Sequence, residues 1–135
     1  MERSDYFDAN GLVSVWLGLT RPERDDRVDI LRDLCGVEAY DLDFQEVVAV
    51  GEFEEAPAGD VLRLLSYSAS FLPAAVRAAA ARGIRSASWA VAQYDFGYDP
   101  TRVCVPVAAD PVFIGSFSWS DAEAEPGAAA KTDRL

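Results

Sequence analysis

The sequence predicts an α+β fold, with helices packed on one face of a mixed or mainly antiparallel sheet in two layers. The chain has 135 residues, half of them apolar, which suits one domain with a packed core. Its apolar segments follow the order strand, helix, strand, helix, helix, strand, strand, strand. We expect this domain to span residues 1–120. Residues 121–135 are charged and poor in large apolar side chains, so we expect a flexible tail there.

The first half of the chain predicts two strands around a helix. Residues 12–19 are largely apolar and predict a buried strand. Thr20 can cap a following helix while Glu23 reaches back to it, and Gly36 is placed to end that helix. Residues 37–44 predict a loop or a short extended piece. Residues 45–53 predict the second strand.

The second half begins with two helices. A short helix is expected from Asp60, and a longer one follows with Ser70 as its cap and Pro73 in its first turn. Gly83 is placed to end the longer helix.

Three strands are expected to complete the fold. Residues 87–96 predict the central strand, because their first half is apolar on both faces. Residues 103–107 alternate valine with other residues and predict a further strand, which Pro106 would confine to an edge. Residues 112–119 predict the last strand. Trp16 and Trp89 lie in the middle of strands and are expected in the core.

Charge restricts the possible partners. The chain has 12 basic and 23 acidic residues, a formal net charge of -11. Such a field repels nucleic acids and anionic membrane surfaces and attracts basic proteins. We therefore expect no nucleic-acid and no membrane partner. The alternative is that the charge only keeps the protein soluble.

The cysteines and the N-terminus predict a cytoplasmic protein. Cys35 and Cys104 form no disulfide framework and no CxxC motif, so we expect reduced thiols. Residues 1–10 lack the apolar core of a signal peptide, and no apolar run reaches the roughly 18 residues needed to span a bilayer.

Catalytic motifs are missing from the sequence. It contains no histidine, which excludes Ser-His-Asp and Cys-His arrangements, and it has no glycine-rich phosphate loop. We expect no enzymatic activity, no cofactor and no metal. Two alternatives stay open: Asp41 and Asp43 as a DxD metal site, and Glu46 and Asp95 as the carboxylate pair of a hydrolase.

An acidic interval predicts the binding surface. Between Arg32 and Arg63 no basic residue occurs, and aromatic residues are interleaved with the acids. Acids steer a basic partner, and aromatic anchors supply contact energy. The predicted partner-binding residues are Tyr40, Asp41, Asp43, Glu46, Glu52, Glu54 and Glu55. The alternative is a solvated face with Phe44 and Phe53 turned into the core.

Four segments together resemble the immunity protein 22 family of bacterial polymorphic toxin systems. Residues 13–18 (VSVWLG) are similar to its V-S-x-W-x-G opening, and residues 40–44 (YDLDF) to its Y-D-x-D-F segment. Residues 66–71 (SYSASF) are similar to S-Y-S-x-S-F, and residues 90–99 (AVAQYDFGYD) to its late apolar strand. The resemblance covers residues 12–99 and does not extend beyond Pro100.

This resemblance implies an α+β antidote that binds and neutralises a cognate toxin domain. Toxins of such systems are often nucleases, whose active sites are lined with basic residues that hold phosphates. An acidic antidote would present carboxylates where phosphates bind. The alternatives are an acidic regulatory or protein-binding domain unrelated to toxins, or a carboxylate-based enzyme.

Overall fold

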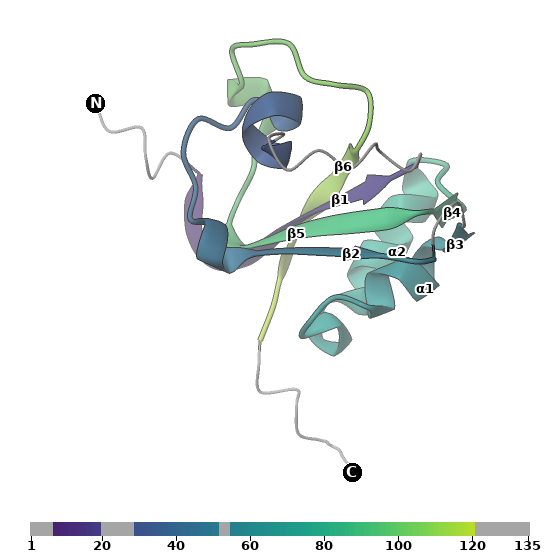
Figure 1. Cartoon of the computed structure of the whole chain (residues 1–135). Helices are drawn as coiled ribbons and strands as arrows, with labels where there is room; N and C mark the ends of the chain where they lie inside the picture. Colours follow the sequence, from purple (N-terminus) through teal and green to yellow (C-terminus); the bar gives the residue numbers. More distant parts are fainter. Residues whose placement is uncertain (1–6, 20–28, 52–54, 121–135) are drawn as a thin grey trace.

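A four-stranded antiparallel sheet forms the centre of the protein (Figure 1). The computed structural model describes residues 7–19, 29–51 and 55–120. The strand order is β2-β5-β1-β6, and each neighbouring pair is antiparallel. Their bounds are Asp8–Gly18 for β1, Gln45–Ala49 for β2, Trp89–Phe96 for β5 and Val112–Ser118 for β6. The predicted α+β class is confirmed, and β5 lies inside the sheet as expected.

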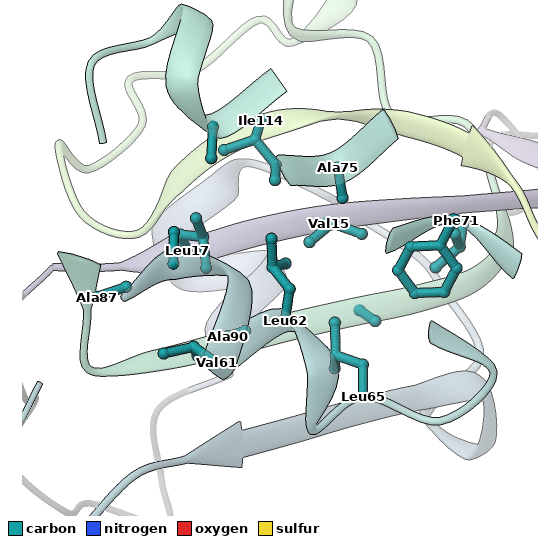
Figure 2. Close-up of a cluster of buried hydrophobic side chains, with 14 of the residues drawn as sticks. Val15, Leu17, Val61, Leu62, Leu65, Phe71, Ala75, Ala87, Ala90 and Ile114 are labelled. Atoms are coloured by element: carbon teal, nitrogen blue, oxygen red, sulfur yellow. The ribbon is translucent and has the colours of Figure 1, made fainter. Parts of the chain in front are cut away.

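Two helices cover one face of this sheet. They are α1 (Ala58–Arg63) and α2 (Leu72–Ala81), joined through a 3-10 turn at Ser68–Ser70. A small ladder of β3 (Ala56–Pro57) and β4 (Ser86–Ala87) lies at one end of them. Figure 2 shows Leu62 of α1 and Ala75 of α2 beside Val15 of β1 in the main core. The alanines of α2 allow the helix to lie close to the strands.

The opposite face is covered by irregular segments. They include a π-helical turn at Ile30–Leu34 and 3-10 turns at Leu42–Phe44 and Pro100–Arg102. A second core lies beneath the first and last of these, around Trp16 and Val91. β1 and β5 are therefore buried on both faces, which explains why residues 12–19 and 89–96 are largely apolar. Trp16 and Trp89 belong to this second core, as predicted.

Two local predictions are wrong. No strand forms at residues 103–107, where Val105 and Val107 are exposed in a loop. Pro106 cannot donate to a ladder, and no strand of the described sheet lies beside this segment. Ser70 does not cap α2 either, because its hydroxyl donates to the carbonyl of Tyr67 within the preceding 3-10 turn.

Other predictions are met in part. Gly36 follows the π-helical turn with a φ of 75°, as expected for a residue that ends a helix. Thr20 and Glu23, the predicted start of that helix, lie outside the described residues, as do Phe53 and the predicted tail at 121–135. The strand expected at 45–53 ends at Ala49.

The second core also determines thiol chemistry. Cys35 is buried there, and burial raises the pKa of its thiol from 9.0 to about 12, whereas Cys104 is exposed. Tyr98 donates its hydroxyl to the Cys35 carbonyl at 2.6 Å, and burial raises the pKa of Tyr98 to about 12. We expect a chromogenic disulfide reagent near neutral pH to count one fast thiol in the folded protein and two after unfolding. Two fast thiols in the folded protein would contradict this packing.

The same pKa shifts predict alkaline destabilisation. Both groups titrate at higher pH in the folded than in the unfolded state, so their stabilising contribution is complete below about pH 9. This contribution is lost as pH rises from about 9 toward about 12, because both groups lose their protons at lower pH in the unfolded chain than in the folded protein. The urea concentration at the unfolding midpoint should therefore fall as pH rises from about 9 to about 12. This fall should be less steep in the Cys35→Ala variant.

A candidate acidic binding surface

Two adjoining hollows lie where the segment before β2 meets the ends of β1, β5 and β6. Their volumes are about 440 and 260 Å³, and they share Phe44, Tyr94 and Asp95 in their linings. We call the pair the acidic hollow. The first part is lined by Asp43, Phe44, Gln45, Glu46, Ser66, Tyr67, Tyr94, Asp95 and Trp119. The second is lined by Asp8, Ala9, Asn10, Asp41, Phe44, Gln93, Tyr94, Asp95 and Phe96.

The lining is strongly acidic. It includes carboxylates from three separate segments, and no lysine or arginine of the described residues lines either part. These carboxylates belong to Asp8, Asp41, Asp43, Glu46 and Asp95. Basic side chains gather elsewhere: Arg63, Arg77, Arg82 and Arg85 lie on or beside α1 and α2. The charges of the described residues are thus unevenly distributed, and the hollow concentrates negative potential.

A short turn presents the first carboxylates. Asp41 is the N-cap of the 3-10 turn Leu42–Phe44, and its Oδ1 accepts a hydrogen bond from the Asp43 amide at 3.0 Å. This capping exposes Asp43, and it leaves Phe44 with 44 % of its surface exposed. The alternative that Phe44 turns into the core is therefore wrong. The turn displays an aromatic ring directly after two acids.

Glu46 has a different part in the hollow. Its Oε1 accepts from the Ser66 amide and the Tyr94 hydroxyl, both at 2.9 Å, and its Oε2 accepts from the Ser66 hydroxyl at 3.0 Å. Burial, followed by this bond to Glu46, raises the pKa of Tyr94 well above its usual range. Glu46 therefore ties β2 to the connection between α1 and α2.

Backbone strain is concentrated in the same place. Among the described residues, the only non-glycine residues with positive φ are Tyr67 at 61° and Asp95 at 58°, and both line the first part of the hollow. The ring of Tyr67 packs against Tyr94 and Trp119, with centroids 5.8 and 5.0 Å away. Strain of this kind costs roughly 1–3 kcal/mol per residue and clusters at functional sites.

The structure divides the predicted binding residues. It brings together Asp41, Asp43 and Glu46, but Glu55 lies beside β3, where it accepts a hydrogen bond from Ser86 at 2.8 Å. Tyr40 does not line the hollow; its hydroxyl donates to Asp29, and burial followed by this bond raises its pKa above its usual range. Glu52 and Glu54 lie outside the described residues.

Several lining residues were not predicted as binding residues. Several of them come from distant parts of the chain: Asp8, Tyr67, Asp95 and Trp119. Strand pairing brings together the segments of Asp8, Asp95 and Trp119, and packing of the α1–α2 connection on Tyr94 adds Tyr67. The sequence pointed to Asp95 only as one carboxylate of the alternative hydrolase pair, together with Glu46. Both line the first part of the hollow, where Glu46 uses both oxygens to accept bonds from the fold itself.

The described part of the chain has neither a metal-binding cluster nor a membrane-spanning helix. No group of three or more His, Cys, Asp or Glu side chains there is arranged to hold a metal ion. No helix of that part is long and apolar enough to cross a membrane.

No protein-family model, no curated protein and no solved structure matches the chain. The resemblance to the immunity protein 22 family therefore stays a prediction.

Proposed function

We propose that the protein is a cytoplasmic antidote, without catalytic activity of its own, that binds and neutralises a basic bacterial toxin domain through the acidic hollow. The observation that carries this proposal is the lining itself, with acids and aromatic rings side by side and no basic side chain among them. Unpaired cysteines, one of them exposed, support a reducing compartment.

The hollow suits a basic protein surface for two physical reasons. Its carboxylates attract cationic side chains over about a Debye length, roughly 8 Å at physiological salt, and this raises the rate of encounter. Its aromatic rings provide rigid contact area that loses little conformational entropy on binding. Tyr67 and Phe44, 43 % and 44 % exposed, are the rings a partner would cover.

A nuclease toxin fits this surface best. Its active site must hold phosphates with lysine and arginine, and a row of carboxylates can occupy those positions. The acidic interval and the family resemblance both support this class of partner. The competing proposal of an unrelated regulatory domain predicts a basic partner without toxicity.

The direct test is rescue of growth. The toxin domain encoded beside this gene is expressed in a heterologous host with and without the protein, and the complex is then isolated and eluted with stepped salt. We expect restored growth and a one-to-one complex that dissociates at high salt. Growth arrest despite stable expression of both proteins would contradict the antidote function.

A further inference from the structure

The hollow contains a buried hydrogen-bond acceptor without a donor. Gln93 is 1 % exposed and lines the second part of the hollow. Its Nε2 donates to the carbonyl of Asp41 at 2.8 Å, and because a carbonyl only accepts, the orientation of the amide is fixed. Its Oε1 then has no partner among the described residues. Gln45 lies opposite it in the β2–β5 register, but the Gln45 Nε2 is a buried donor that is likewise without a partner, so the two side chains do not pair.

An orphaned acceptor of this kind is costly. Leaving a buried polar atom without a partner costs roughly 1–3 kcal/mol, and most such atoms in native proteins are paired. A ligand that brought a donor to Gln93 Oε1 would recover this cost on binding. The acceptor therefore points to a hydrogen-bond donor as the missing group.

Asp95 offers a second acceptor, held in a fixed position. Its Oδ1 accepts from the Gly11 amide at 2.9 Å and from the Trp119 indole at 3.3 Å. Both bonds use the same oxygen, so Oδ2 has no donor in the described part of the chain. Asp95 has a φ of 58°, and it lies where the β1–β5 register shifts between Asp8 and Val13. Strain and hydrogen bonds together hold the carboxylate in place before any partner arrives.

The lining around these two atoms suits a planar cation. Asp41 adds another carboxylate, and Phe44 and Tyr94 add aromatic rings. A guanidinium group has five donors and no acceptor, pairs with carboxylates in a fork, and stacks on rings. A lysine ammonium is compact and strongly hydrated, and it does not stack in this way.

We propose that the second part of the acidic hollow is a seat for one arginine side chain of the partner. The guanidinium binds between Asp41 and Asp95, stacks on Phe44 or Tyr94, and donates to Gln93 Oε1. Access to that buried atom needs a shift of the lining. Phe44 has room to move, being half exposed and without a ring partner among the described residues. This inference rests on the proposed function, because the arginine belongs to the basic partner.

The test uses small probes, so it does not depend on the toxin. Acetyl-arginine methylamide is titrated into the isotope-labelled protein, and the NMR signals of the Gly11 amide, the Trp119 indole and the Gln93 side-chain amide are followed. We expect saturable shifts with a Kd on the order of 1 mM. The lysine analogue should bind at least about threefold more weakly, and the neutral citrulline analogue should cause no saturable shift.

Two isosteric variants make the test specific. Asp95→Asn retains the acceptor for Gly11 and Trp119, and asparagine tolerates positive φ, so the fold should persist. We expect at least about fivefold weaker arginine binding in this variant and in Asp41→Asn, and no change in Asp60→Asn on α1. Equal affinity for the arginine and lysine analogues would contradict the arginine seat. An equal loss of arginine affinity in Asp60→Asn would also contradict it. Growth rescue would still decide the antidote function separately.

Discussion

Neutralising three acids of the hollow should slow association with the toxin domain by about tenfold at low salt. The variant is Asp41→Asn, Asp43→Asn and Asp95→Asn together. Each asparagine keeps a side-chain oxygen, so the Asp41 cap and the bonds from Gly11 and Trp119 to Asp95 can persist while charge is removed. The measurement is the association rate by stopped flow at low salt and at about 0.5 M salt. The variant should show the smaller salt dependence.

A matched control separates local from overall charge. Glu38→Gln, Glu55→Gln and Asp60→Asn remove the same charge from exposed acids that line neither part of the hollow. We expect the control to slow association by less than about twofold. Equal slowing in both triple variants would mean that net charge, and not the hollow, steers the partner.

Gly18→Ala should destabilise the fold by about 3 kcal/mol, at the upper end of overpacking costs. A Cβ at Gly18 would lie 1.9 Å from the indole nitrogen of Trp89. Trp89 pairs with Gly18 across the β1–β5 register and is 3 % exposed, so the indole has little space to retreat. Chemical denaturation should show a lower midpoint with an unchanged slope.

Gly59→Ala is the control for this prediction. Gly59 lies in α1, and an added Cβ would make only an ordinary contact, 3.5 Å from a methyl of Val76. Alanine favours the helix over glycine, so we expect a stability gain of about 0.5 kcal/mol. A Gly18→Ala variant as stable as Gly59→Ala would show that Trp89 does not pack over Gly18.

The strands of the sheet were predictable, because burial leaves a direct pattern in the sequence. Residues 12–19 and 87–96 are largely apolar, because β1 and β5 have a core on each face. The second face was not predicted to be covered, because all helices were expected on one face. The turn Ile30–Leu34, part of the helix expected to end at Gly36, packs on the second face instead, and the rest of its cover is mainly irregular. The strand predicted at residues 103–107 rested on alternating valines alone. Alternation does not supply a neighbouring strand, and none lies beside this segment among the described residues.

The binding surface was predictable only where it is local in sequence. Asp41, Asp43 and Glu46 are close along the chain and meet in the hollow. Glu55 is also close in sequence, yet β2 carries the chain to the other end of the sheet before it. Asp8 and Asp95 join the site through strand pairing, which a linear charge count does not contain.

Hydrogen exchange of the protein with and without its purified partner tests the central claim most directly. Binding at the acidic hollow predicts slowed exchange in residues 41–46, 66–67 and 93–95, and no change in α2 or in the β3–β4 ladder. Slowed exchange confined to the α1–α2 face or to the loop at 103–107 would contradict it and place the binding surface elsewhere.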